Sequence, residues 1–451
     1  MANFPMYGEV DPDHVVRKCG WRILPIIMFG FLLCFLDRIN VGMAALTMNA
    51  DLGLSPAAFG FGVGLFFWGY CSSEILSSMA LGKFGARKWL ARIMVVWGAA
   101  SLAMAWVSTP TQFYVLRFLL GMAEAGFVPG TLYFFRGWFP RRYYNGMVGL
   151  FLVSNPLASL IGNPLSGLIM EHLNGALALK GWQWLFIVES IPTILLGIVV
   201  FFVLPDRPSE VSWLEPAEKQ WLVTTIAEER TGLKISDSSV FRILTNWRIW
   251  LVSLVNHVFV VGIYGVTFFL PQIVKDFGLS TTQVGFVSAI PSLFGAAAIV
   301  VLSRNSDRTG ERAWHNVFCA VLAIVGLLLT AYAPTPLLKM VGLTVAAMGV
   351  LAGNVVFWGM PNALIGGAQA AAAFGLINTI GSFGGVVGPN IMGLLREATG
   401  SFRSGLIGLA VCQILAIVIA LYFRKEVNVR DDSSHSEDTP STRARRMTAT
   451  R

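Results

Sequence analysis

Long apolar stretches, separated by short polar segments, run along most of the chain. A helix that crosses a hydrocarbon core of about 30 Å needs about 20 apolar residues, and twelve stretches of the chain meet that requirement. They span 22–44, 59–81, 89–107, 112–134, 146–168, 184–204, 248–272, 284–303, 316–333, 338–358, 370–394 and 402–423. The pattern predicts an all-α membrane protein with twelve transmembrane helices.

The composition favours the same class. Of the 451 residues, 55% are hydrophobic and 13% are charged, and the mean hydropathy is +0.66, whereas about 25% of the residues of a soluble domain are charged. The five cysteines are scattered and form no CxxC pair, so neither a metal site nor a disulfide framework is expected. No cluster of loop acids and no nucleotide-binding motif stands out, so we expect no enzyme, no cofactor and no direct ATP drive.

Basic residues set the expected orientation. The net charge of +8 comes from Lys and Arg in short loops, so we expect a lipid bilayer rather than a nucleic acid as the partner. Three loops on one side of the predicted helices carry most of this charge, through Lys83, Arg87, Lys88, Arg136, Arg141, Arg142, Arg304, Arg308 and Arg312. By the positive-inside rule both termini are cytoplasmic, and the short loops suit a multi-pass protein of a bacterial inner membrane.

A polar segment divides the predicted helices into two sets of six. We expect a cytoplasmic N-terminus at 1–21, a six-helix bundle at 22–204, a cytoplasmic linker at 205–247 and a second bundle at 248–423. Within the linker, LEPAEKQWLVTTIAEER predicts an amphipathic helix that begins near Pro216. The remaining residues, 424–451, are rich in Ser, Thr, Asp and Arg and are expected to be a disordered cytoplasmic tail.

The two halves carry an internal repeat with an offset of 225 residues. This shift places Gly85 and Arg87 of GKFGARK onto Gly310 and Arg312 of SDRTGER. The same shift brings GNPLSG onto VGPNIMG, so that their prolines, in the fifth and eleventh predicted helices, coincide. Parallel repeats of this kind are typical of transporters in which one half rocks against the other around a site at the membrane midplane.

Several motifs resemble those of a known family. SDRTGER is similar to the cytoplasmic loop motif of the major facilitator superfamily, and FLDRINVG and RFLLGMAEAGFVPG are similar to signatures of its anion:cation symporter family. The resemblance covers residues 20–424 and implies the major facilitator fold and uptake of organic anions with protons. It also implies that the loops gate the transporter, through Gly85, Arg87, Asp307, Arg308, Gly310 and Arg312. One departure is Gly82, which stands where the family usually carries an Asp.

Asp37 and Arg38 are adjacent charges inside an apolar stretch. An ionised residue at a helix centre costs about 2.5–3.5 kcal/mol, and Asp37 lies about 22 Å along the first predicted helix at about 1.5 Å per residue. Neighbours on a helix point about 100° apart, so each of the two needs a partner of its own. A structural salt bridge or an Arg38 that snorkels outward is one interpretation. The other is that Arg38 clamps a substrate carboxylate in a central cavity.

The fourth predicted helix supplies further charges. Arg117 and Glu124 are seven residues apart and share a helix face. Burial favours a neutral acid and a nearby guanidinium favours a carboxylate, so such a residue can carry a proton. The resemblance implies that Asp37 and Glu124 couple protons, that Arg38 binds the anion and that Arg117 supports the relay. We expect substrate to bind at Arg38 when both acids are neutral.

The second half lacks equivalent acids, because the offset maps Asp37 and Glu124 onto Gly262 and Gly349. We therefore expect proton coupling in the first half and a pocket shaped mainly by the second. For that pocket the resemblance points to polar or aromatic side chains of both halves, with two further candidates of lower rank. These are Trp358, Asn378 and Tyr70, followed by Asn155 and Tyr264. Core packing or contacts between helices would explain each of them equally well.

Together these features predict a monomeric proton symporter that imports an organic carboxylate by alternating access. The aromatic candidates favour an aromatic acid such as phthalate, while sugar acids and tartrate stay open. The alternative within the same fold is an anion exchanger without proton coupling. A channel is disfavoured because it has no need of paired Gly-Pro helices in both halves.

Overall fold

The computed structural model describes residues 10–230, 244–365 and 370–434, and all regular secondary structure within these ranges is helical. Each of the twelve predicted stretches lies in one helix or in consecutive helices. Within the described residues, ten helical spans have the length and composition to cross a membrane. The other two predicted positions are filled by α2 (Pro56–Phe84) and by the pair α17 (Ala370–Ser382) and α18 (Gly384–Thr399). The predicted all-α membrane fold is confirmed.

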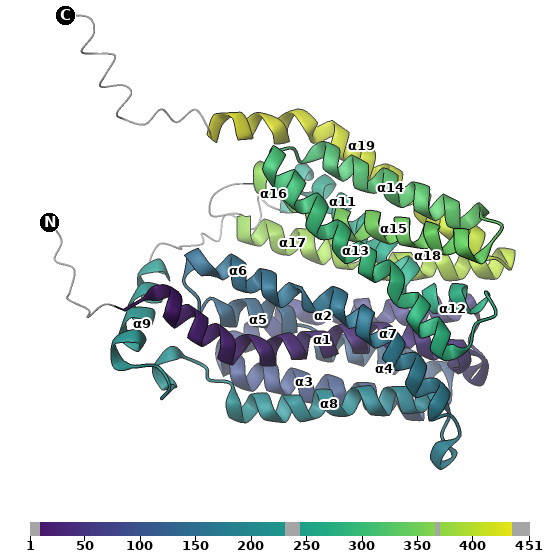
Figure 1. Ribbon diagram of the computed structural model, residues 1–451, viewed down its shortest axis with the longest axis horizontal. Coiled ribbons are helices and arrows are strands. Elements are labelled where there is room, and N and C mark those ends of the chain that lie inside the picture. Colours follow the sequence, from purple (N-terminus) through teal and green to yellow (C-terminus); the bar gives the residue numbers. More distant parts are fainter. Residues whose placement is uncertain (1–9, 231–243, 366–369, 435–451) are drawn as a thin grey trace, which may run out of the picture.

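Figure 1 shows two bundles joined by the linker helix α9 (Pro216–Arg230). The N-terminal bundle comprises α1 (Pro12–Leu52), α2, α3 (Ala86–Ala103), α4 (Pro110–Glu124), α5 (Phe127–Phe135), α6 (Arg141–Leu152), α7 (Ser154–His172) and α8 (Gly181–Val203). The C-terminal bundle comprises α11 (Trp247–Thr267), α12 (Leu270–Lys275), α13 (Thr281–Thr309), α14 (Ala313–Tyr332), α15 (Pro336–Val356), α16 (Gly359–Leu364), α17, α18 and α19 (Phe402–Ser434).

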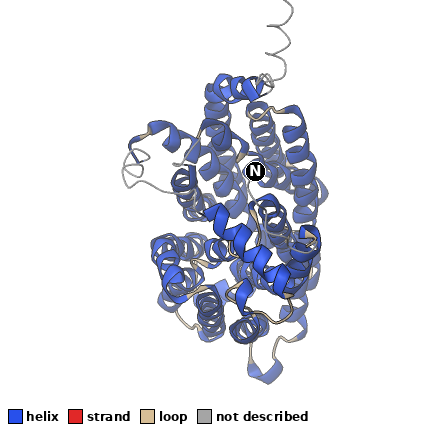
Figure 2. Cartoon of the chain, turned by 90° about the vertical axis from the view of Figure 1, so that its left-hand side faces the viewer, coloured by secondary structure: helices blue, strands red, loops and turns tan. Residues whose placement is uncertain are grey.

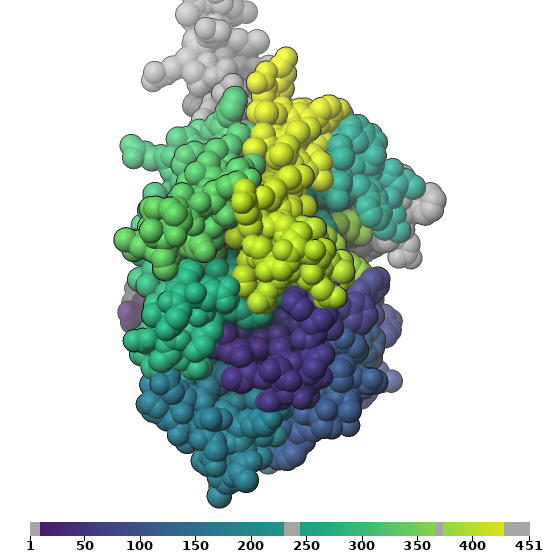
Figure 3. Space-filling view, turned by 90° about the vertical axis from the view of Figure 1, so that its right-hand side faces the viewer, coloured from purple at the N-terminus to yellow at the C-terminus, as the bar shows by residue number. Residues whose placement is uncertain are grey.

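The bundles have two distinct ends. The start of α1, the helix α9 and the last turns of α19 lie at the same end, which we call the linker end, and α12 lies at the opposite, distal end. Figure 2 faces the linker end and shows most helices running away from the viewer. Figure 3 faces the distal end, where purple N-terminal segments abut yellow C-terminal ones. Across this seam between the bundles, α7 packs on α13 and α2 packs on α18.

Several predicted helices are broken, and the break after α4 positions a charge. Glu124 is the last residue of α4, and Gly126 adopts a φ of 94° before α5 begins. This backbone conformation favours glycine. A Cβ at Gly126 would also lie 2.0 Å from Ser77 Oγ, so the chain needs glycine here on two grounds. The break therefore places Glu124 at the end of a helix inside the bundle.

Glycines let the two bundles approach closely near the distal end. A Cβ on Gly60 would lie 2.4 Å from the carbonyl oxygen of Pro389, and one on Gly285 would lie 2.4 Å from that of Asn163. Gly60 and Gly285 are related by the offset of 225 residues. Small residues allow this backbone contact between membrane helices, and the repeat supplies them on both sides of the seam.

Two carboxylates reach across the seam to helix starts in the opposite bundle. Glu397 accepts hydrogen bonds from Ser55 Oγ (2.5 Å) and from the Ala57 N–H (2.9 Å) at the start of α2. Glu171 accepts hydrogen bonds from Ser280 Oγ (3.0 Å) and from the Thr282 N–H (2.6 Å) at the start of α13. We call these contacts the distal latches. An anion at a helix N-terminus interacts favourably with the helix dipole, so the latches favour the closed distal seam.

The predicted boundaries differ from the structure at both ends of the chain. The first helix begins at Pro12 rather than near 22, because its opening turns are polar and capped by Asp11. Helix α19 continues to Ser434, so the first part of the predicted tail is helical; Glu426 there pairs with Arg248 at 2.9 Å. Residues 435–451 lie outside the described residues. The amphipathic linker helix is present as predicted, with Leu222 fully buried.

Opening of the distal seam should follow loss of the latches. In a Ser288→Cys background, whose reporter side chain is buried on α13, replacing Glu171 and Glu397 by Gln should raise the rate of labelling by a water-soluble maleimide. Gln keeps the size of Glu but removes the charge that interacts with the helix N-terminus. Glu210→Gln, an exposed change in the linker, is the matched control. Equal labelling rates in all variants would show that the latches do not hold the seam.

Candidate functional site

The charged residues predicted in the N-terminal bundle meet at one level of the molecule. Arg38, Tyr70 and Glu124 all lie about 21 Å from the distal ends of α1, α2 and α4, at about 1.5 Å per residue. Arg38 Nη2 donates to Glu124 Oε1 in a buried ion pair. Arg38 Nη1 donates to the Tyr264 hydroxyl of α11 at 3.1 Å. Arg38 therefore contacts both bundles.

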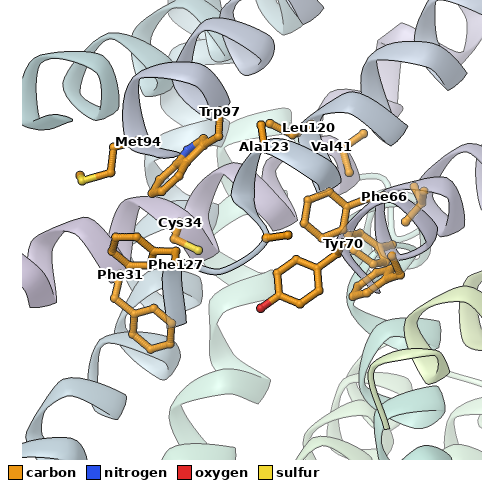
Figure 4. Close-up of a cluster of buried hydrophobic side chains, with 14 of the residues drawn as sticks. Phe31, Cys34, Val41, Phe66, Tyr70, Met94, Trp97, Leu120, Ala123 and Phe127 are labelled. Atoms are coloured by element: carbon orange, nitrogen blue, oxygen red, sulfur yellow. The ribbon is translucent and has the colours of Figure 1, made fainter. Parts of the chain in front are cut away.

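Aromatic rings surround the Arg38 guanidinium. Its central carbon lies 4.8 Å from the ring centre of Phe35, 5.2 Å from that of Phe66 and 5.3 Å from that of Tyr70. Figure 4 shows Phe66 and Tyr70 side by side among the buried side chains of the bundle. Ring faces attract a desolvated cation, so these contacts offset part of the cost of burying Arg38.

A second guanidinium lies in the same cluster without a hydrogen-bond partner. Arg117 is fully buried, and its central carbon lies 5.0 Å from the ring centre of Phe66. Within the described part of the chain, none of its three nitrogens has a hydrogen-bond partner, and Glu124 Oε2 has none either. Arg38 is therefore paired with a carboxylate, whereas Arg117 has no hydrogen-bond partner among the described residues. An unpaired buried charge is costly, so an anion bound beside Arg117 would be favourable.

Asp37 points into a different part of the N-terminal bundle. Its carboxylate accepts from Trp97 Nε1 at 2.8 Å, from Ser101 Oγ at 2.9 Å and from Thr193 Oγ1 at 3.3 Å. The expectation that Asp37 and Arg38 need separate partners agrees with this geometry. Asp37 is 1% exposed and has no cation among these partners, so three neutral donors compensate its burial.

The other predicted pocket residues lie nearer the linker end. Asn378 Nδ2 donates to Glu74 Oε1 at 3.4 Å across the seam. Asn155 is half-buried near the start of α7. Trp358 lines a cavity of about 370 Å³ together with Asp307 and Arg312. It lies just beyond the end of α15, about 12 Å further from the distal end than Arg38 lies along α1, at about 1.5 Å per residue. The structure thus joins Tyr70 and Tyr264 to Arg38, but it does not bring Trp358 to the cluster.

The predicted gating loops lie at the linker end. In the C-terminal bundle Asp307 and Arg312 form an ion pair of 2.6 Å, Gly310 has a φ of 68°, and Arg308 is exposed in the last turn of α13. In the N-terminal bundle, Gly85 has a φ of 84° at the turn between α2 and α3. These positive φ values explain why both loops carry glycine.

The loop between α2 and α3 pairs with an acidic residue that is distant in the chain. Asp206, just after α8, accepts from the Arg87 N–H at 2.8 Å and lies 3.5 Å from Arg87 Nε. It thereby supplies a negative charge that the loop itself lacks, because Gly82 occupies the usual acidic position. No local motif in the sequence indicates this pairing.

Other contacts of the site also escaped prediction. Cys34 Sγ lies 3.1 Å from Glu124 Oε1, and Phe35 and Phe66 flank the guanidinium of Arg38. The donors to Asp37 are single polar residues within apolar stretches. In the sequence these donors, such as Ser101 in α3 and Thr193 in α8, stand out only as polar residues at membrane positions.

Comparisons with known proteins agree on one family. A model of the Major Facilitator Superfamily matches residues 27–389. A putative tartrate transporter of Agrobacterium vitis is 43% identical over 95% of this chain and 97% of its own length. A quinolone resistance transporter of Acinetobacter baumannii is 38% identical over 90% of this chain and 94% of its own. The crystal structure of a D-xylose-proton symporter shares the fold, with a TM-score of 0.71 at 15% identity, over 89% of this chain and 96% of that one.

Because Arg38 pairs with Glu124 and Arg117 has no hydrogen-bond partner, replacing each arginine should have opposite effects on the stability of the protein. Arg38→Met leaves the buried Glu124 without its hydrogen-bonded cation, which costs about 3–5 kcal/mol, so the melting temperature in detergent should fall. Arg117→Met removes a cation that has no hydrogen-bond partner, so the melting temperature should stay equal or rise. Met matches the length of the apolar part of Arg in both variants. A larger loss for Arg117→Met than for Arg38→Met would refute this description of the cluster.

Proposed function

Since the chain belongs to the major facilitator superfamily, we propose that this membrane transporter imports an organic carboxylate together with protons. The observation that carries the proposal is the cluster of two buried guanidiniums, of which Arg38 pairs with Glu124 and Arg117 has no hydrogen-bond partner among the described residues. When Glu124 is protonated, a substrate carboxylate would take its place beside these guanidiniums. A planar guanidinium suits such a group because it can bind both oxygens at once.

Proton binding at Glu124 would release Arg38. In the described state the Glu124 carboxylate is bound to the Arg38 guanidinium, which the substrate carboxylate would bind. When Glu124 takes up a proton, it no longer neutralises Arg38, and a substrate carboxylate can replace it without a net change of charge in the cluster. Substrate and proton are thereby bound together. After substrate leaves, loss of the proton restores the Arg38–Glu124 pair and closes the cycle.

Tyr264 would connect substrate binding to the movement of the bundles. It belongs to α11 of the C-terminal bundle, yet it accepts a hydrogen bond from Arg38 of the N-terminal bundle. Its ring also lies 4.5 Å from that of Phe67 on α2. A substrate on Arg38 would compete for this contact and so change how the two bundles meet. Alternating access requires such a link between the bundles.

The orientation of the chain in the membrane bears on the direction of transport. The basic loops lie at the linker end, and the positive-inside rule assigns that end to the cytoplasm. The distal end then faces outward, and its seam is closed by the latches. We propose that the described state is the inward-facing one and that outward opening requires the distal seam to part.

The surroundings of the cluster bear on the substrate class. An aromatic acid such as phthalate was favoured partly by Trp358, which lies away from Arg38, and the rings of Phe35, Phe66 and Tyr70 already cover the guanidinium. A small hydroxy acid of the tartrate kind needs no further ring face. The putative tartrate transporter of Agrobacterium vitis supports this choice. Phthalate and sugar acids are the competing substrates.

A substrate panel tests the class directly. A ligand that binds the folded protein raises its apparent stability, by about 2.7 kcal/mol at a concentration 100 times the Kd. We expect tartrate to raise the melting temperature of the purified protein more than phthalate, a hexonate or a fluoroquinolone does. Arg38→Ala should abolish the shift, and Glu210→Gln should keep it. A shift with the fluoroquinolone alone would refute a small hydroxy acid as the substrate.

Coupling is tested in proteoliposomes with an imposed pH gradient, acidic outside. Wild type should accumulate substrate with a measurable proton influx, and Arg38→Ala should show no uptake. Glu124→Gln and Asp37→Asn should exchange labelled for unlabelled substrate but should not accumulate it. Accumulation by either neutral variant would refute the assignment of that acid. Uptake by wild type without proton movement would favour the anion exchanger.

A further inference from the structure

A third buried carboxylate, Glu189, lies between α8, α1 and α7. It is 3% exposed. Its Oε2 accepts from Asn40 Nδ2 at 2.9 Å, and its Oε1 accepts from Ser166 Oγ at 2.7 Å. Neither donor is charged, so no cation holds the carboxylate among these contacts. An ionisable residue inside a membrane bundle is a functional candidate by default because its burial is costly.

Glu189 and Asp37 are joined by two neighbouring contacts between α1 and α8. Asn40, one turn after Asp37 on α1, donates to Glu189. Thr193, one turn after Glu189 on α8, donates to Asp37 at 3.3 Å. Among the described residues near Glu189, the titratable one is Asp37 of α1, and Ser166 of α7 is neutral. The donors that α3 supplies to Asp37 are neutral as well. Each acid is thus bound by a residue one turn from the other acid.

The surroundings of Glu189 can serve both of its protonation states. Asn40 Nδ2 donates to the carboxylate, while Asn40 Oδ1 is buried without a hydrogen-bond partner among the described residues. A half-turn of the Asn40 amide would present this oxygen as an acceptor to a protonated Glu189, since an amide carries donors and acceptors at similar positions. The Ser166 hydroxyl can likewise donate or accept. A site built only for packing has no need of this freedom.

Helix α7 connects Glu189 to the distal seam. Ser166 precedes Gly167, whose Cβ position would lie 2.8 Å from the carbonyl oxygen of Thr281 on α13. Asn163, one turn earlier, donates to the Ser288 carbonyl at 3.4 Å. The residue that donates to Glu189 is therefore next to one that closes the seam. When α7 parts from α13, the face of α7 beside Ser166 becomes open to water.

Glu189 also lies nearer the distal end than Asp37 does. It is about 12 Å from the start of α8 at that end, whereas Asp37 is about 22 Å from the distal end of α1, at about 1.5 Å per residue. A proton that enters from the distal side reaches the level of Glu189 first. Asp37 and the Arg38–Glu124 pair lie further inward, at about the same level as each other.

We propose that Glu189 is the proton-uptake residue of the transporter, which receives a proton through the opened distal seam and passes it to Asp37. In this step the Glu189 carboxylate binds a proton from water. The resulting acid then gives the proton to the Asp37 carboxylate and is left ionised again, so charge and protons balance. The proposal rests on the proposed proton symport and adds the route by which its protons arrive.

The decisive test compares Glu189→Gln with Glu189→Asp in proteoliposomes. Gln keeps the size of Glu but cannot ionise, whereas Asp keeps the ionisable group and loses one methylene. Proton uptake by this residue predicts that Glu189→Gln lowers pH-driven accumulation about tenfold or more, while Glu189→Asp retains most of it. A packing role predicts the reverse order, because Gln fits the site better than Asp. Either the reverse order or equal activity overturns the proposal.

Two controls separate this outcome from failure of the proposed function. Counterflow of labelled substrate at equal pH on both sides needs no net proton movement, so Glu189→Gln should match wild type there. Loss of counterflow together with accumulation would show a structural role and would overturn the proposal. Glu210→Gln controls for loss of a carboxylate elsewhere. If wild type itself moves no protons, the proposed symport is refuted. If wild type moves protons and Glu189→Gln takes them up normally, only the role of Glu189 is refuted.

Discussion

The ion pair between Arg38 and Glu124 is the interaction on which the central site depends. In a membrane bundle a buried charge must be matched nearby, and here Glu124 pairs with Arg38, while Arg117 has no hydrogen-bond partner among the described residues. The aromatic rings around Arg38 reduce the cost of burying its charge. Any change at Glu124, whether a proton or a competing anion, alters which groups Arg38 can bind, and Arg38 touches both bundles.

The two bundles have similar architecture and different chemistry. Their helices follow one repeat, and the contacts that close the distal seam occur in pairs, as with Gly60 and Gly285. Among the described residues, the buried acids of the bundles, Asp37, Glu124 and Glu189, all belong to the N-terminal one. The positions equivalent to Asp37 and Glu124 are Gly262 and Gly349, which pack closely against neighbouring side chains and backbone. One bundle thus holds the charge, and the other provides the surface against which it moves.

The sequence predicted the fold well because the thickness of a membrane fixes the length of each apolar stretch. It also located the charged cluster, since Arg38 and Glu124 stand out against apolar neighbours. What it could not supply was the rotation of each helix, which decides partners in other helices. Arg87 pairs with Asp206, which is distant in the chain, and Trp358 lies at the level of the loops rather than beside Arg38. Helix boundaries failed where polar turns continue a helix beyond the apolar stretch, as at Pro12 and Ser434.

The paired contacts of the distal seam resemble an interface between two copies of one protein. In a dimer with two-fold symmetry, a patch on one subunit meets the equivalent patch on the other, so every contact occurs twice. Glu171 and Glu397 each cap a helix of the opposite bundle, and Ser55 and Ser280 receive them at positions related by the repeat. Such an arrangement is expected if six-helix subunits once assembled as a homodimer before their genes fused. The seam would then be older than the transport chemistry, and fusion would have allowed the acids to be kept in a single half.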